Sequence, residues 1–398
     1  MICVGIDVSK DKSTVAIMKI GGEVLAAPYD VIHTRESLNL LADRILELGD
    51  NVRVVMEVTG HYYLPVSTIL VEKGFFVSVV NALIVKKFCS QDLRGAKTDE
   101  IDSLNIAEYG LVNWNKLTSV TPVDEDYAQL RMLSRQYHQM TLMAVKARVN
   151  LSNLLDKVMP GVTALFPKSK GKNKLENFVE RYCHFEKILK MGKQRFVSDY
   201  CNWAKKQGYR MNERKANAVF ALAQDGIPVI PNTAVTKLVV LETVRVLLET
   251  EKSRKAILSQ MTVIVKTLPE YEVVRAMNGV GDVLAPRLIA EIGDIRRFEN
   301  RNSLIAYAGI DVPPYKSGKF IATERHITKR GNKYLRHAGY EVMDSLNKNR
   351  TKHADDPVCD FILKKKSEGK KHKKALIAGL NKFLRIYFAR VSEVYEKI

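Results

Sequence analysis

Four carboxylates in the first part of the chain have the chemistry and the spacing of a metal site. Asp7 lies in the run GIDVSK and Glu57 in VVMEVTG, while Asp99 and Asp102 lie in KTDEIDS. Residues three apart share one face of a helix, so Asp99 and Asp102 would point the same way. Clustered carboxylates need cations to stay ionised, and hard oxygen ligands suit Mg²⁺, with Mn²⁺ as a substitute. Two such ions can activate attack at a phosphodiester.

Each of these acids also has an ordinary structural explanation. An aspartate at a strand end is often a turn residue, and acids in the first turn of a helix complement its dipole. We favour the metal site because the acids fall, in order, on a first strand, a fourth strand and a following helix, and not because of any one of them.

The elements that would hold the acids follow from the local pattern. The pair Gly21-Gly22 predicts a hairpin turn, and Thr98 is predicted to be the N-cap of a helix. The segments rich in β-forming residues are 2–9, 13–20, 23–31, 52–58 and 75–80. Helical spacing occurs over 35–48, over about 62–73 and from Thr98 onward. This order predicts an α/β domain of the ribonuclease-H-like class over residues 1–120, with its first and fourth strands adjacent. Asp7 and Glu57 would then face each other.

The remainder of the chain is predicted to be mainly helical. Two apolar-periodic segments, about 124–157 and 234–267, are too long for ordinary globular helices and suit an antiparallel coiled coil, so 121–269 forms a second predicted domain. The stretch between them, about 165–232, is basic and weakly patterned, and we read 168–174 as an exposed loop. Residues 270–398 form a third, mainly α domain.

Charge is distributed unevenly along the chain. The net formal charge is +19, but residues 1–120 carry −3 and residues 121–398 carry +22. A polyanionic partner explains this asymmetry, since each neutralised phosphate releases counterions; a solubility surface is the alternative. The five cysteines form no CxxC pair, which fits a reducing compartment. With no apolar run of about 18 residues and no signal-peptide pattern, we expect a cytoplasmic protein without membrane contact.

A basic segment near residue 320 could contact nucleic acid. Aromatic residues alternate there with basic ones, which grip phosphates while the rings stack on bases. The candidate contacts are Lys316, Lys319, Arg325, Lys329, Arg330, Asn332, Lys333 and Arg336. Gly279 and Gly281 in NGVGD resemble the turn of a helix-hairpin-helix, where backbone amides approach a phosphate, although an ordinary loop fits equally well. The lysine run 364–374, KKKSEGKKHKK, is a backbone contact or a solvated face.

Taken together, GIDVSK, VVMEVTGHYY, KTDEIDS, YAGIDVPPYKSG and ITKRGNKYLR resemble the insertion-sequence one-ten family of DEDD transposases, relatives of the Piv-type DNA invertases. The resemblance implies a RuvC-like domain, a coiled coil and a C-terminal transposase domain. It implies Asp7, Glu57, Asp99 and Asp102 as metal ligands, and a serine nucleophile, here Ser317, that becomes linked to DNA. It also implies guidance by a structured bridge RNA that pairs with donor and target DNA. Ser103 departs from the family, which commonly has alanine there.

The resemblance points to a recombinase of a bacterial or archaeal mobile element, associated with the nucleoid. A serine followed by glycine is, on residue type alone, more often a turn than a nucleophile. Three other readings stay open: a Holliday-junction nuclease that uses the same acids for hydrolysis, a Piv-type invertase, and a non-catalytic nucleic-acid-binding protein. The long helices favour a homo-oligomer, either a dimer or a tetramer.

Overall fold

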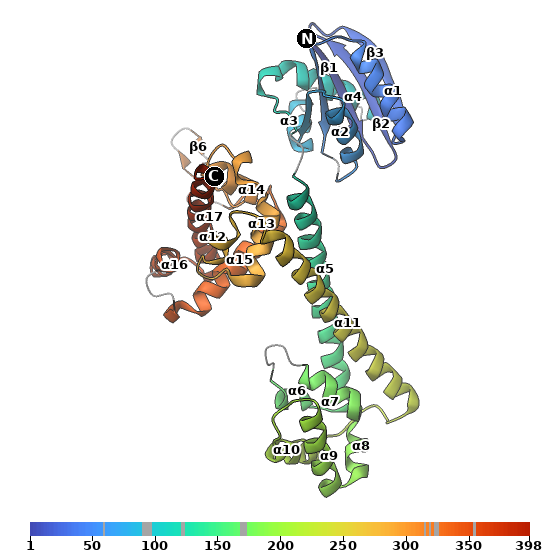
Figure 1. The fold of residues 1–398 in the computed structure, drawn as a ribbon, viewed down its shortest axis with the longest axis vertical. Coiled ribbons are helices and arrows are strands. Elements are labelled where there is room, and N and C mark those ends of the chain that lie inside the picture. Colours follow the sequence, from blue (N-terminus) through green and yellow to red (C-terminus); the bar gives the residue numbers. More distant parts are fainter. Residues whose placement is uncertain are drawn as a thin grey trace. The chain divides into compact units, whose positions relative to one another are not determined.

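The structure, a computed structural model, divides into two compact units. It describes residues 1–58, 60–89, 98–120, 124–167, 173–313, 316–317, 320–321, 326–352 and 356–398. The first unit spans Met1–Val123 and the second Asp124–Ile398, and each is considered by itself (Figure 1). Within the described ranges, no helix has both the length and the apolar character to cross a membrane.

A mixed five-stranded sheet forms the centre of the first unit. The strands are β1 (Ile2–Val8), β2 (Lys12–Lys19), β3 (Val24–Ile32), β4 (Val52–Glu57) and β5 (Val77–Val80). They lie in the order β3-β2-β1-β4-β5. Strand β2 is antiparallel to both of its neighbours, β1 and β3, whereas β4 and β5 are parallel to β1. This is the strand order of a ribonuclease-H-like fold, and it confirms the predicted neighbours β1 and β4.

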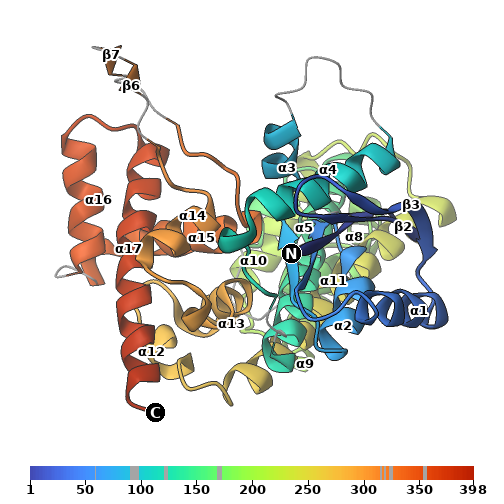
Figure 2. The same cartoon turned by 90° about the horizontal axis from the view of Figure 1, so that it is seen from above.

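Helices cover both faces of this sheet (Figure 2). On one face of the sheet, α1 (Arg35–Leu46) and α2 (Tyr63–Glu72) pack on Val4, on Ile6 and on the other strand side chains that point to that face. On the other face, α3 (Ala82–Cys89) and α4 (Asp99–Val112) pack on Cys3 and Val55. Side chains alternate along a strand, so odd-numbered residues of β1 and β4 face α4. The sequence analysis missed α3.

Helix α4 approaches β1 unusually closely. A Cβ atom on Gly5 would lie 2.3 Å from the carbonyl oxygen of Ser103, and one on Gly110 would lie 2.3 Å from the Sγ atom of Cys3. Glycine at both positions therefore lets helix and strand backbones touch. Since Ser103 lies over Gly5 while Gly110 lies over Cys3, the helix runs in the opposite direction to β1.

Two long antiparallel helices organise the second unit (Figure 1). They are α5 (Glu125–Val158) and α11 (Ala234–Val265), which match the predicted pair. Arg148 donates to Glu251 at 2.7 Å, while Arg254 donates to the Tyr137 hydroxyl at 3.0 Å. From Tyr137 to Arg148 the chain advances along α5, while their partners go back along α11 from Arg254 to Glu251. The two helices are therefore antiparallel.

The stretch between the long helices has a core of its own, which the sequence analysis did not anticipate. It contains α6 (Val162–Leu165), α7 (Lys174–Tyr182), α8 (Phe185–Met191), α9 (Lys193–Lys206) and α10 (Glu213–Asp225). Phe178, Tyr200 and Trp203 are buried there against the end of α5 and the start of α11. The hydrophobic pattern of this stretch is weak because exposed lysines separate the aromatic core residues along the sequence. Most of the predicted loop 168–174 lies outside the described residues, and Lys174 begins α7.

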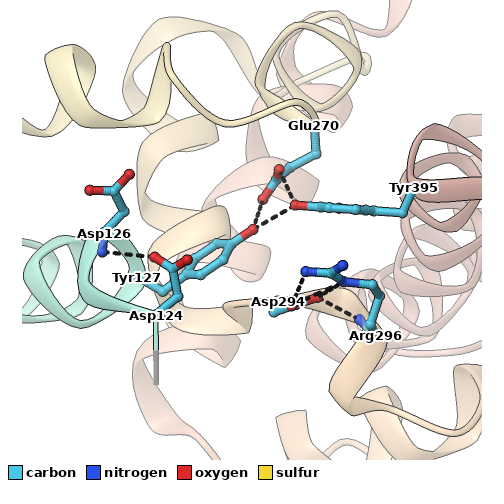
Figure 3. A network of polar contacts seen from close by, with 7 residues as sticks. All are labelled: Asp124, Asp126, Tyr127, Glu270, Asp294, Arg296 and Tyr395. Atoms are coloured by element: carbon cyan, nitrogen blue, oxygen red, sulfur yellow. Dashed lines mark hydrogen bonds and ion pairs between the residues drawn. The ribbon is translucent and has the colours of Figure 1, made fainter. Parts of the chain in front are cut away.

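The remaining helices form a core with the beginning of α5 and the end of α11. They are α12 (Tyr271–Arg275), α13 (Gly281–Ile292), α14 (Arg301–Ala308), α15 (Lys333–Lys348), α16 (Pro357–Ser367) and α17 (His372–Glu396). Figure 3 shows a buried link across this core: Tyr127 of α5 and Tyr395 of α17 donate to opposite oxygens of Glu270, at 2.7 and 2.8 Å. The two long helices and this core belong to the same compact unit, Asp124–Ile398. The domain boundary predicted at residue 270 stays a prediction.

The Gly5 contact generates a stability prediction. Gly5→Ala places a methyl group inside the backbone of α4, and overpacking of this kind costs about 1–3 kcal/mol. We expect a clear loss of unfolding free energy in denaturant titrations. Gly22→Ala is the control, because a Cβ there meets nothing within 4 Å and only the positive φ of 86° is strained. Equal losses in the two variants would contradict close packing as the cause.

Candidate active site

Asp7 and Glu57 lie at the carboxyl ends of two neighbouring parallel strands. Ile6 pairs with Met56 in the sheet, so Asp7 and Glu57 are the next residues at the carboxyl ends of β1 and β4. By strand alternation both lie on the face covered by α4, and both are half-buried. The predicted meeting of these two acids across the sheet therefore has the required backbone geometry.

The start of α4 brings the other two acids to the same end of the sheet. The Thr98 side chain caps the helix by accepting from the Ile101 amide at 3.3 Å. The buried stripe of α4 contains Ser103, Ile106, Ala107 and Gly110. Asp99 and Asp102 continue this stripe toward the helix start. Because α4 runs against β1, its first turn lies toward Asp7 and not toward Ile2.

Ser103 fits this packing without disturbing the acids. Its side chain is fully buried, and its hydroxyl donates to the Glu100 carbonyl oxygen of its own helix at 2.8 Å. The hydroxyl is thus satisfied locally. The departure from alanine at this position leaves the approach of α4 to Gly5 intact.

An ion pair that the sequence analysis missed flanks the four acids. Thr14 lies opposite Asp7 in the sheet and donates to Asp30 at 2.8 Å. Lys12 donates to the other oxygen of Asp30 at 2.6 Å. The hydrogen bond to Asp30 is the main cause that raises the pKa of Lys12, and the negative charge of Asp99 raises it further. The Lys12 ammonium thus lies within electrostatic reach of Asp99, one of the four metal-ligand candidates. Pairing of residues 12–14 with the third strand was the sequence signal that could have revealed this ion pair.

The four acids fit a magnesium site in donor type and in backbone placement. Their carboxylate tips are not already gathered: in the described part of the chain, no three His, Cys, Asp or Glu side chains form a group that could hold a metal. All four candidate ligands are oxygen donors, as Mg²⁺ and Mn²⁺ prefer. Cation binding would therefore require the carboxylates to be drawn together at one end of the sheet, with β1, β4 and α4 already in place.

Ser317 lies in a short two-stranded ribbon of the second unit. Strand β6 (Lys316–Ser317) pairs antiparallel with β7 (Phe320–Ile321), and Ser317 is opposite Phe320. The candidates Lys319 and Arg325 lie outside the described residues. The exposure and contacts of the Lys316 and Ser317 side chains lie outside the description as well.

Two of the predicted nucleic-acid contacts have roles inside the fold. Asn332 caps α15 by accepting from the Tyr334 and Leu335 amides, and its Nδ2 donates to Glu291, which is fully buried, at 2.8 Å. Arg336 donates to the carbonyl oxygens of Ala308 and Gly331 at 3.0 and 3.1 Å. These two side chains shape the segment before α15. The Asn332 amide is used in these internal bonds, whereas only Nη1 of Arg336 takes part in the two bonds to carbonyl oxygens.

The other basic residues of this segment are available at the surface. Lys329, Arg330 and Lys333 are exposed. Lys329 has a positive φ of 55°, which belongs to the tight turn that leads into the Asn332 cap. The structure therefore separates the segment into residues that hold its shape and residues that can meet a ligand.

The two glycines of NGVGD differ in the same way. A Cβ on Gly279 would lie 2.6 Å from Leu346 Cγ, so this glycine allows close packing of the turn against α15. A Cβ on Gly281 would meet nothing within 4 Å, and Gly281 begins α13. Of the pair, Gly281 is the one with open space for a ligand.

Comparisons with known proteins match both ends of the chain. Residues 4–160 match the family model "DEDD_Tnp_IS110: Transposase", and residues 271–357 match "Transposase IS116/IS110/IS902 family". The chain belongs to the IS110/IS116 family of transposases. The transposase is 23% identical over 326 residues to "Insertion element IS110 uncharacterized 43.6 kDa protein" of Streptomyces coelicolor, covering 82% of this chain and 78% of that protein.

A second relative covers almost the whole transposase. "Insertion element IS116 uncharacterized 44.8 kDa protein" of Streptomyces clavuligerus is 23% identical, covering 98% of this chain and 95% of the relative. Among solved structures, Thermus thermophilus RuvC is 15% identical over 30% of this chain and 98% of RuvC, with a TM-score of 0.23. A score of that size supports no conclusion. The stretch containing α6–α10 lies between the two family models.

Cation binding gives a direct test of the four acids. A ligand that binds only the folded state raises stability, by about 2.7 kcal/mol at a hundredfold excess over its Kd. We expect Mg²⁺ to raise the Tm of the transposase and expect Asp102→Asn to abolish most of that rise, since one ligand is lost. Without Mg²⁺, Asp102→Asn should be no less stable, because repulsion among acids is relieved.

The control for this experiment is Glu108→Gln, which removes one negative charge from an exposed position of the same helix. Its Mg²⁺-dependent rise in Tm should match that of the unmodified protein. An Asp102→Asn protein with an unchanged Mg²⁺ response would contradict a role of this acid in cation binding.

The internal role of Asn332 is tested by two substitutions. Asn332→Asp keeps the oxygen that caps α15 but removes the donor to Glu291, and Asn332→Ala removes both. Loss of an N-cap costs about 1 kcal/mol, and an unsatisfied buried partner costs about 1–3 kcal/mol more. We expect both variants to lower the free energy of unfolding, whereas the exposed Asn217→Ala should change it little; unchanged stability in both would refute the assignment.

Proposed function

We propose that this transposase is a DNA recombinase in which Asp7, Glu57, Asp99 and Asp102 hold two divalent cations at the scissile phosphate. The observation that carries the proposal is the packing of α4 against Gly5, which directs the first turn of the helix to the strand ends bearing Asp7 and Glu57. When bound, the cations supply charge neutralisation at the phosphate and activation of the attacking group. The acids of the chain supply the ligands and fix where the phosphate is held.

We further propose Ser317 as the nucleophile of strand exchange. Its Oγ attacks the phosphorus and loses its proton to a base, while the bond between phosphorus and the leaving DNA oxygen breaks and that oxygen is protonated. The serine then carries a phosphodiester. Attack by the hydroxyl of a second DNA end forms the new DNA bond and returns the serine, so bond energy is conserved and no ATP is needed.

Donor and target DNA are the proposed substrates, and a structured bridge RNA is the proposed guide. The net charge of +22 over residues 121–398 supports a polyanionic partner. Guidance by RNA rests on the resemblance of the sequence motifs to the family, and assembly as a dimer or tetramer rests on the two long helices α5 and α11. Exposed Lys329, Arg330 and Lys333 are proposed phosphate contacts near the serine segment.

Replacement of the serine separates binding from chemistry. Ser317→Ala should abolish strand exchange, because alanine has no oxygen that could form the covalent link, while affinity for DNA and RNA remains. The measurements are recombination of a donor and target pair, and denaturing gels that trap a protein–DNA adduct. Ser198→Ala, at an exposed position of α9, is the matched control.

The adduct also discriminates the competing nuclease. If Asp7→Asn stops DNA cleavage but no adduct ever forms in the unmodified protein, hydrolysis replaces the serine mechanism. Recombination at the normal rate by Ser317→Ala would overturn the proposed nucleophile.

A further inference from the structure

A compact lysine-rich hairpin joins the last two helices. Residues 364–374 contain seven lysines and a histidine but a single acid, Glu368. They form the end of α16, a turn at Gly369 with φ of 82°, and the start of α17. This segment lies beyond the residues matched by the C-terminal family model, which end at 357.

The hairpin is held rigidly. A Cβ on Gly379 would lie 2.4 Å from Ile362, so α16 and α17 are in close contact, and Lys382 donates to the Pro357 carbonyl oxygen at 2.8 Å. Ala375 and Leu376, directly after the lysines, are buried in the core. The charges are therefore presented by a folded element and not by a solvated tail; the two helices lie side by side in Figure 2.

Interactions within the protein account for the lysines at the end of α16. Lys364, Lys365 and Lys366 occupy the last turn of α16, where cations complement the helix dipole. Lys365 pairs with Glu368 at 2.7 Å, and Lys366 donates to Asn347 at 2.6 Å. These lysines are accounted for by the fold.

The remaining lysines lie at the start of α17, where their positive charge opposes the helix dipole. Helix α17 begins with His372, Lys373 and Lys374 after Lys371 as N-cap, with no acid in its first turn and no side-chain cap. Cations at the positive end of a helix are unfavourable, and Lys370, Lys371 and Lys373 are all exposed. A folded element that gathers repelling charges in this way is suited to an external anion.

We propose that the hairpin 364–374 binds the phosphate backbone of a nucleic acid that the transposase engages. The segment has no apolar side chain, so it offers nothing to insert into a lipid surface or a protein core. Repeated cations without base-reading groups suit sequence-independent contact to successive phosphates. This inference rests on the proposed function only for the kind of ligand, and it concerns binding without chemistry.

The test compares two triple variants of the full chain. Lys370→Gln, Lys371→Gln and Lys373→Gln remove charge from the hairpin. Lys19→Gln, Lys73→Gln and Lys116→Gln remove the same charge from exposed positions of the first unit. Binding to a DNA duplex of arbitrary sequence and to a folded RNA is measured with chelator present over a range of salt, so failure of the cation site or of Ser317 cannot affect the result.

Each lost phosphate contact lowers the slope of log K against log salt by about 0.9 on duplex DNA. We expect the hairpin variant to lose at least about tenfold in affinity at 0.1 M salt, with a slope shallower by about 2–3, for DNA, for RNA or for both. The ligand that shows the loss identifies the source of the phosphates. Tm should not fall, since repulsion at the start of α17 is relieved.

The proposal is overturned if the hairpin variant and the control bind both nucleic acids with the same affinity and salt slope. It is also overturned if the hairpin variant loses binding only to vesicles of anionic lipid. Equal losses in both variants would indicate a general charge effect and would likewise contradict a specific surface.

Discussion

The contact between the backbone of α4 and Gly5 of β1 is the constraint on which the candidate site depends. A helix normally stands off a sheet by the length of its side chains. Glycines at 5 and 110 remove that spacing at two points and so fix both the position and the direction of the helix. The acids in its first turn are thereby placed at the strand ends that carry Asp7 and Glu57.

Charge balance at this end of the sheet comes partly from the protein itself. Lys12 and Thr14 hold Asp30 two strands away from Asp7, and the Lys12 ammonium also senses Asp99. The acids are half-buried or exposed, so they can accept cations from solvent without first breaking a core. A backbone frame that already brings the four acids to one end of the sheet is compatible with cation binding that accompanies DNA binding.

The second unit uses polar groups to set shape and leaves its charges at the surface. Glu270 joins the first turn of α5 to the last turn of α17, and Glu291 anchors the Asn332 cap. Both glutamates are buried, and each accepts from neutral donors, which satisfies their oxygens inside the core. Exposed cations such as Lys329 and Lys371 are then held on fixed elements and remain available to phosphates.

The sequence by itself determined the strand order and the two long helices, because alternation and helical spacing are local patterns that survive in almost any context. It also predicted the four acids as a set, and the fold brings their backbone positions to one end of the sheet. It did not reveal the α6–α10 core, since its aromatic residues are separated by exposed lysines and meet only after the chain folds back. Nor could it divide Asn332 from Lys329, or Gly279 from Gly281, because residue type is similar and the difference lies in which neighbour each one touches. Tertiary contacts alone decide whether a polar residue serves the fold or the ligand.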